Sequence, residues 1–215
     1  MTLEIDSVDL EFAGRKILYG IYIKSEQGKV TGILGRNGSG KTSLLRILFG
    51  DLKPKYKNIR SNGKCLPKPL YLTEKIGYLP QYSLLPKHLN IKLAFGLFKV
   101  SWGQFINHFQ SFKVYDKNRI KNLSSGEIRL IEAYLVLMSN KEIILLDEPF
   151  SFIAPIYVEK FKALLNQVKK RSIIILTDHF YTDILAVSDT VYLLKNGCSK
   201  KIEDKKELKR EGYIN

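Results

Sequence analysis

Four short aliphatic runs constrain the fold of this chain more than any other feature. Each run is apolar at nearly every position and leads into a loop or a helix-like segment. Continuous apolar runs, unlike alternating ones, indicate strands that are buried on both faces, as in a parallel sheet covered by helices. The sequence therefore predicts an α/β fold around a parallel sheet. The four runs are KVTGILG, KIGYLPQ, EIILLDEP and SIIILTD.

Two other segments depart from this pattern. Residues 190–202, TVYLLKNGCSKKI, place two strand-like stretches around an Asn-Gly turn and predict a terminal hairpin. Residues 82–140 are rich in aromatic side chains and lack a strong strand signal, so we interpret them as a helical insertion. At this length we expect one globular unit. Its core would span residues 1–81 and 141–199, with a basic tail at 200–215.

The charge and composition favour some environments over others. A net charge of +14 and a pI near 9.6 favour an acidic partner, either a nucleic acid or the anionic face of a membrane. The two cysteines are too few for a disulfide framework or a zinc site, which fits a reducing cytosol. The aliphatic runs are far shorter than the roughly 18 apolar residues of a membrane span. The acidic start is also unlike a signal peptide. We therefore expect a protein that is neither exported nor membrane-spanning.

A glycine-rich loop supplies the first chemical motif. Residues 35–42, GRNGSGKT, match the pattern G-x-x-x-x-G-K-[ST] and lie between a predicted strand and a predicted helix. Such a loop cradles phosphates with its backbone N–H groups, while Lys41 neutralises the β- and γ-phosphates and Thr42 can bind Mg²⁺. The motif therefore predicts a nucleoside triphosphate site. Its cofactor-binding residues are Gly35, Arg36, Asn37, Gly38, Ser39, Gly40, Lys41, Thr42 and Ser43.

The run EIILLDEP supplies a second motif. It ends in Asp147 and Glu148, and ligands of parallel sheets bind at the carboxyl ends of the strands. Adjacent acids at a strand end are commonly just solvated, but beside a phosphate loop each acid has a role. We expect Asp147 to hold Mg²⁺, directly or through water, and Glu148 to accept the proton of the attacking water.

A loop without lysine precedes another predicted helix. Ser124 and Glu127, in NLSSGEIRLIEA, form an S-x-x-E capping box, so a helix is expected to start near Gly126. The free N–H groups and the positive end of the dipole at such a start favour an anion. On these residues alone, an ordinary capped helix is the simpler interpretation.

The phosphate loop, LSSGE and LLDEP, in this order, resemble the ATP-binding cassette (ABC) transporter ATPases over nearly the whole chain. LSSGE is similar to the signature of that family, L-S-G-G-Q, with Ser125 in place of a glycine and Glu127 in place of the glutamine. The resemblance implies ATP and Mg²⁺ as cofactors, a P-loop NTPase core, an N-terminal antiparallel β subdomain and a helical insertion that carries the signature. LLDEPF and TDH further resemble the branch that serves lipopolysaccharide export and branched-chain amino-acid import.

The resemblance also implies a dimer. ATPases of this family pair head to tail, so the signature of one subunit contacts the γ-phosphate of the ATP held by the other. By this resemblance, Ser124, Ser125, Gly126 and Glu127 bind ATP in trans. Two ATP molecules would then lie between two subunits, either identical or different.

Three further positions match the family one by one. Gln81 ends the run KIGYLPQ, where the family's Q-loop glutamine contacts Mg²⁺ and senses the transport subunit. His179 follows SIIILTD and is similar to the switch histidine that contacts the γ-phosphate, so we group Gln81, Glu148 and His179 as catalytic. Phe12 is similar to the aromatic residue that stacks on adenine, although a buried aromatic fits its position equally well.

One position departs from the family pattern. Ala154, in FSFIAP, stands where the D-loop of the family carries an aspartate that couples the two ATP sites, so weak coupling is expected. The aromatic residues of the insertion could line a groove for a transport subunit, although an aromatic stripe more often belongs to a core. These residues are Phe95, Phe98, Trp102, Phe105 and Phe109.

The resemblance as a whole implies the ATP-binding and ATP-hydrolysing subunit of an ABC transporter. Such a subunit drives a separate integral membrane subunit and lies in the cytoplasm, peripheral to the inner face of the membrane. The alternative is an ABC-type ATPase that acts on nucleic acid or ribosomes. Chains of that kind usually carry two cassettes with a charged linker, or a long coiled-coil insertion, and this sequence has neither. We therefore expect no specific nucleic acid partner.

Overall fold

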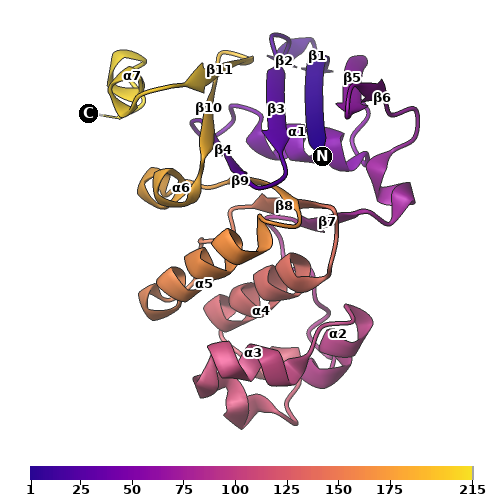
Figure 1. Cartoon of the computed structure of the whole chain (residues 1–215), viewed down its shortest axis with the longest axis vertical. Coiled ribbons are helices and arrows are strands. Elements are labelled where there is room, and N and C mark those ends of the chain that lie inside the picture. Colours follow the sequence, from indigo (N-terminus) through magenta and orange to yellow (C-terminus); the bar gives the residue numbers. More distant parts are fainter. Residues whose placement is uncertain (215) are drawn as a thin grey trace.

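The computed structural model describes residues 1–214 and has three parts. A six-stranded sheet with its flanking helices lies in the middle, an antiparallel sheet lies at one end, and the helices α2 and α3 lie at the opposite end (Figure 1). This is an α/β fold, as the aliphatic runs predict.

The central sheet has the strand order β11-β10-β4-β9-β8-β7. Its five strands from β10 to β7 run parallel, and only β11 is antiparallel. The pair β10 and β11 is the hairpin that the Asn-Gly turn predicts. The strands are β4 (Val30–Leu34), β7 (Ile76–Leu79), β8 (Ile143–Asp147), β9 (Ile173–Thr177), β10 (Thr190–Lys195) and β11 (Cys198–Ile202).

Both faces of this sheet are covered, which explains the continuous apolar runs. Along β8, Ile143 and Leu145 pack in one hydrophobic cluster with residues of α1 and the antiparallel sheet. Ile144 and Leu146 pack in a second cluster with α4, α5 and α6. The helices are α1 (Lys41–Phe49), α4 (Ser125–Met138), α5 (Pro155–Val168) and α6 (Tyr181–Val187).

The antiparallel sheet is built around β1, which pairs with β2, β3 and β5. Burial alternates along the first half of β1, where Leu3 and Ile5 face the core and Thr2 and Glu4 are more exposed. This alternation is typical of a sheet with one solvated face. The N-terminal antiparallel subdomain is thus confirmed. Its strands are β1 (Thr2–Phe12), β2 (Arg15–Leu18), β3 (Tyr22–Glu26), β5 (Tyr56–Ser61) and β6 (Lys64–Cys65).

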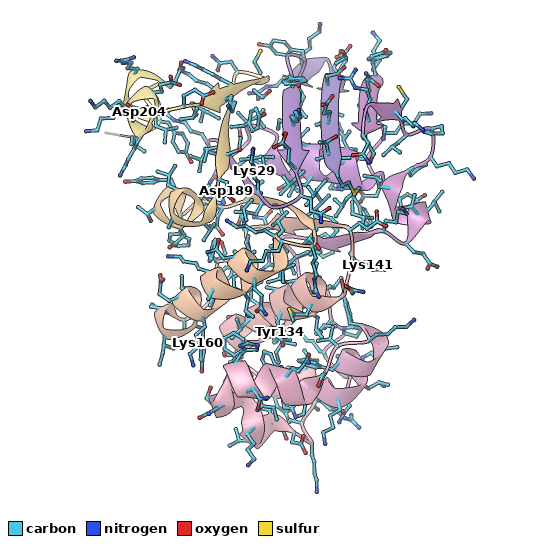
Figure 2. The ribbon with its side chains drawn as sticks, in the orientation of Figure 1. Lys29, Tyr134, Lys141, Lys160, Asp189 and Asp204 are labelled. Atoms are coloured by element: carbon cyan, nitrogen blue, oxygen red, sulfur yellow. The ribbon has the colours of Figure 1, made fainter. Side chains whose placement is uncertain are left out.

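The described residues between β7 and β8 form helices and no strand. Phe95, Phe105 and Phe109 are at most 1% exposed and surround Tyr134 of α4, which lies where α4 meets these helices (Figure 2). The core interpretation, which the sequence favours, is therefore confirmed for these three phenylalanines, and the groove alternative does not apply to them. Phe98 and Trp102 pack against the same cluster. The elements are α2 (Ile91–Leu97), α3 (Trp102–His108), and the short 3₁₀ helices η2 (Gln110–Tyr115) and η3 (Ile120–Asn122).

The C-terminal segment folds back on the central sheet. Helix α7 (Lys205–Arg210) buries Leu208 completely, and Glu211 forms ion pairs with Lys195 at 3.1 Å and Lys200 at 2.9 Å. The Gly212 carbonyl accepts a hydrogen bond from Arg36, at 2.9 Å. The tail therefore reaches the glycine-rich loop. Within residues 1–214, no helix combines the length and the apolar character that crossing a membrane requires.

Candidate nucleotide-binding and catalytic site

The glycine-rich loop connects β4 to α1. Gly38 and Gly40 have left-handed backbone conformations, with φ of 77° and 98°, which strain any residue with a side chain. At Gly40 a Cβ atom would also lie 2.7 Å from the side chain of Leu18. Gly40 caps α1 without a side-chain hydrogen bond, so the first N–H groups of the helix can donate to a phosphate instead.

Lys41, the first residue of α1, is held over this loop. It is 6% exposed, and its Nζ donates hydrogen bonds to the backbone carbonyls of Gly35, at 2.8 Å, and Arg36, at 3.3 Å. Burial lowers the pKa of Lys41, while the nearby carboxylates of Glu148 and Asp147 act in the opposite direction. The buried ammonium group is therefore placed to bind phosphate oxygens.

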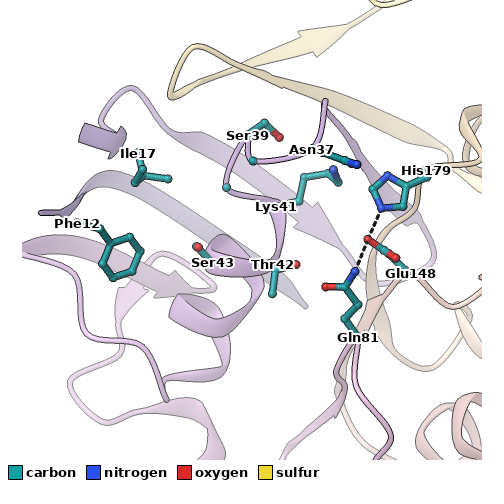
Figure 3. Close-up of a pocket in the computed structure, with 12 residues that line it drawn as sticks. Phe12, Ile17, Asn37, Ser39, Lys41, Thr42, Ser43, Gln81, Glu148 and His179 are labelled. Atoms are coloured by element: carbon teal, nitrogen blue, oxygen red, sulfur yellow. Dashed lines mark hydrogen bonds and ion pairs between the residues drawn. The ribbon is translucent and has the colours of Figure 1, made fainter. Parts of the chain in front are cut away.

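A cavity of about 370 Å³ lies against the loop. Asn37–Ser43 line it, and Figure 3 shows Phe12 and Ile17 on one side of the loop, with Gln81, Glu148 and His179 on the other. The structure thus brings together residues that are widely separated in the sequence. Phe12 is 49% exposed at the end of β1, so a core role for this aromatic residue does not apply.

Glu148 lies between two polar side chains from other segments. Its Oε1 accepts a hydrogen bond from Gln81 Nε2 at 3.1 Å and lies 2.5 Å from His179 Nε2. Glu148 has a left-handed backbone conformation, with φ of 54°, which is strained for a residue with a side chain. It directly follows β8, and this backbone turn accompanies a carboxylate that faces the cavity. Such a carboxylate can accept a proton from a water molecule.

Asp147, the last residue of β8, is fully buried. Its Oδ1 accepts a hydrogen bond from Thr177 Oγ1 at 2.7 Å, whereas its buried Oδ2 has no hydrogen-bond partner among residues 1–214. Burial raises the pKa of this carboxyl group. The Thr42 hydroxyl is close enough to Asp147 to act against this rise in pKa, and Thr42 and Gln81 both line the cavity. An unpartnered carboxylate oxygen beside a hydroxyl group fits a hard divalent cation such as Mg²⁺.

Asp178 is a functional candidate that the sequence interpretation missed. It is fully buried, and its carboxylate accepts hydrogen bonds from the backbone N–H groups of Phe150 at 2.9 Å, His179 at 2.7 Å and Phe180 at 3.1 Å. Asp178 therefore holds the backbone at His179 and Phe180 next to the backbone at Phe150. The available signal was an acid at the end of the apolar run SIIILTD, directly before the histidine.

The predicted capping box is present at the start of α4. Ser124 Oγ accepts from the Glu127 backbone N–H at 3.3 Å, and Glu127 Oε2 accepts from the Ser124 N–H at 2.8 Å. Burial raises the pKa of Glu127, but hydrogen bonds from Ser124 and Tyr115 outweigh it, so the net pKa is lowered. Ser124, Ser125, Gly126 and Glu127 do not line the cavity at the phosphate loop of their own chain.

The segment after Glu148 contacts this helix start. Phe152 has a φ of 69° and is 77% exposed, and its backbone carbonyl lies so close to Gly126 that a Cβ atom there would collide with it. Only glycine fits at position 126 without moving this segment. Ala154 caps α5 without a side-chain hydrogen bond, because its methyl group offers none.

The fold and this arrangement of motifs define a P-loop NTPase. A family model described as ABC transporter matches residues 18–151, which is more than half of the chain. The chain belongs to the ABC transporter family, whose ATPases bind ATP.

Three known proteins illustrate this similarity. The chain is 30% identical over 200 residues to a "Probable ABC transporter ATP-binding protein" of Azorhizobium caulinodans, which covers 86% of this chain and 71% of that protein. It is 26% identical over 212 residues to the lipopolysaccharide export system ATP-binding protein LptB of Escherichia coli, covering 91% and 88%. A solved nucleotide-free ATP-binding cassette from an ABC transporter matches the fold with a TM-score of 0.81 over 100% of both chains, at 23% identity.

Proposed function

We propose that this chain is the ATP-hydrolysing subunit of an ABC transporter. The observation that carries the proposal is the meeting of four segments at one cavity, namely the phosphate loop, Gln81, Glu148 and His179. Lys41 and the N–H groups of the loop would bind the phosphates of ATP, and Phe12 would stack on the adenine. The steady-state release of phosphate from ATP by the purified chain is the direct test.

The proposed hydrolysis needs one proton acceptor and a fixed geometry. Glu148 would take the proton of the attacking water, and Gln81 and His179 would orient its carboxylate through the contacts at 3.1 Å and 2.5 Å. Asp147, Thr42 and Gln81 would hold Mg²⁺, which when bound would neutralise charge on the phosphates.

The signature residues would act on ATP held by a second subunit. They lie outside the cavity of their own chain, and Ser124 and Ser125 are exposed. The start of α4 offers N–H groups to an anion, and the phosphate loop supplies Lys41. Two chains arranged head to tail would therefore complete each other's sites, either as a homodimer or with a different ATPase.

Ser124→Arg is expected to leave ATP binding by the monomer intact and to prevent ATP-induced dimerisation, because the bulky side chain would collide with the nucleotide of the other subunit. Size-exclusion chromatography with light scattering, in the presence of Mg²⁺ and ATP, measures this effect. Ser111→Arg, on the exposed surface of η2, is the matched control. A normal ATP-dependent dimer of Ser124→Arg would refute the assignment in trans.

We also propose an integral membrane subunit as the partner, with this chain peripheral to the cytoplasmic face of the membrane. The support is the family, the transport system named for LptB, and a net charge of +14 that suits an anionic surface. Residues 82–140 would form the subdomain that contacts this subunit, and residues 1–81 and 141–199 the nucleotide-binding core.

Affinity purification of the tagged chain from native membranes is expected to recover an integral membrane protein and little nucleic acid. The reason is that phosphate contacts to a basic surface weaken steeply with salt, whereas a specific protein interface does not. The measurement is mass spectrometry and nucleic acid staining of material washed at high salt. Retention of RNA or ribosomes under these conditions would favour the alternative function instead.

A further inference from the structure

Two charged side chains of α4 are buried and have no part in the mechanism above. Arg129 is 5% exposed and Glu132 is 1% exposed, and they lie one turn apart with Arg129 Nη1 3.9 Å from Glu132 Oε2. Charged residues are almost never buried this completely unless they are paired and hydrogen-bonded. Their partners therefore indicate what the pair does.

Arg129 binds the ends of two strands. Its Nη1 donates to the carbonyl of Pro80 at 2.7 Å, while its Nη2 and Nε donate to the carbonyl of Glu148 at 3.0 and 3.3 Å. Nη2 also contacts the carbonyl of Asp147. These carbonyls belong to Glu148 itself and to the residues directly before Gln81 and Glu148. The planar guanidinium group of Arg129 therefore sets the spacing between the backbone segments that carry Gln81 and Glu148.

Glu132 binds the other side of Gln81. Its Oε1 accepts hydrogen bonds from Ser83 Oγ at 2.8 Å and from the backbone N–H groups of Leu84 at 2.7 Å and Leu85 at 2.9 Å. Gln81 thus lies in a short segment that is held at Pro80 by Arg129 and at residues 83–85 by Glu132. Both anchors come from one helix, α4.

Stability alone is a weak reason for this arrangement. Burial lowers the pKa of Arg129, although Glu132 and Asp147 oppose that shift, so the charged pair carries a desolvation cost. A well-packed apolar pair of similar volume often stabilises a core equally well. An apolar pair could not bind five backbone carbonyl and N–H groups in two separate loops. Nor could it support Glu148 in its left-handed conformation, whose φ is 54°.

We propose that Arg129 and Glu132 are positioning residues for ATP hydrolysis, which hold Gln81 and Glu148 in register with each other and tie both to α4. The proposal rests on the proposed function of Glu148. Because α4 begins with the signature residues, a displacement of its first turn is passed through two buried side chains to both catalytic residues. The signature residues and Glu148 are therefore rigidly connected through α4.

The first test separates catalysis from binding. Arg129→Met is expected to lower kcat by roughly 100-fold, because a displacement of about 1 Å has an effect of that size. The Kd for ATP should change by less than about threefold, since Arg129 does not line the cavity at the phosphate loop. Arg129→Lys keeps the charge but cannot reach all these carbonyls, so it should recover only part of the rate. Arg119→Met, the same change at an exposed position, is the control.

Glu132 provides an independent pair of variants. Glu132→Gln keeps an oxygen that can accept from Leu84 and Leu85 and should retain most of the rate, whereas Glu132→Leu removes the acceptor and should behave like Arg129→Met. Equal rates in Glu132→Leu and the wild type would overturn the proposal. The proposal would also be overturned if Arg129→Met and Glu132→Leu lowered the ATP affinity, the kcat and the melting temperature together, because that pattern indicates general destabilisation.

Hydrogen exchange provides a measurement that does not depend on turnover. In Glu132→Leu the amides of Leu84 and Leu85 should exchange at least about tenfold faster, and in Arg129→Met those of Glu148 and Ser151 should do the same. The amides inside α4 should remain protected in both variants. Unchanged exchange at these four amides would overturn the proposal. A wild-type chain that binds ATP without hydrolysing it would contradict the proposed function. Even then, the exchange rates would decide whether Arg129 and Glu132 hold the loops that carry Gln81 and Glu148.

Discussion

Glu148→Gln is expected to bind ATP and almost stop hydrolysing it. The amide has nearly the shape of the carboxylate, so the contacts with Gln81 and His179 can persist, but it cannot accept the proton of the attacking water. Loss of a general base typically lowers the rate by about 10²- to 10⁴-fold. Phosphate release at saturating ATP measures the effect, and calorimetry measures the retained affinity.

The same variant should accumulate as an ATP-bound dimer, because a dimer closed by ATP reopens when the ATP is hydrolysed. Light scattering with Mg²⁺ and ATP would detect the larger species. Glu142→Gln, which makes the same change on the exposed surface, should behave like the wild type. Wild-type hydrolysis by Glu148→Gln would show that another group takes the proton.

Lys41→Ala is expected to abolish ATP binding itself, whereas Glu148→Gln is expected to bind ATP and lose only its hydrolysis. The substitution removes a buried positive charge that lines the cavity, and no other lysine lines this cavity among the described residues. Hydrogen bonds between charged groups contribute about 1.5–3 kcal/mol each, so a loss of at least about 100-fold in affinity is expected. Isothermal titration with ATP measures this loss directly.

The control for this variant is its stability without nucleotide. Lys41 also binds the carbonyls of Gly35 and Arg36, so its removal could loosen the loop. Lys41→Arg keeps the charge and should show an intermediate affinity, with a melting temperature close to that of the wild type. Undiminished affinity of Lys41→Ala for ATP would rule out this cavity as the nucleotide site.

The sequence predicted the parallel sheet because the burial of its strands is visible residue by residue. In β8 and β9 the first four residues alternate between the two cores, so the apolar pattern has no gap before the polar residue that ends each strand. The capping box at Ser124 and Glu127 was equally visible, because its two partners are three residues apart. Features that depend on short spacing or on burial of both faces were therefore accessible without a structure.

Other parts of the site depend on which strands are neighbours. His179 meets Glu148 because β9 lies beside β8, and no local pattern specifies this order. Arg129 and Glu132 escaped notice because charged residues in a helix usually indicate a solvated surface. The sequence favoured a core for Phe95, Phe105 and Phe109 but left a groove open, since spacing alone does not distinguish the two.

The position of β4 in the sheet has a consequence for how the chain acquires its site during synthesis. β4 leads into the phosphate loop, yet its two hydrogen-bonded neighbours are β9 and β10, which begin at Ile173 and Thr190. A nascent chain that ends before residue 173 has neither neighbour in place, although the loop itself has long left the ribosome. Contacts of such long sequence separation form late and slowly. ATP binding by a ribosome-bound chain would therefore mark the completion of the whole sheet rather than the appearance of the loop.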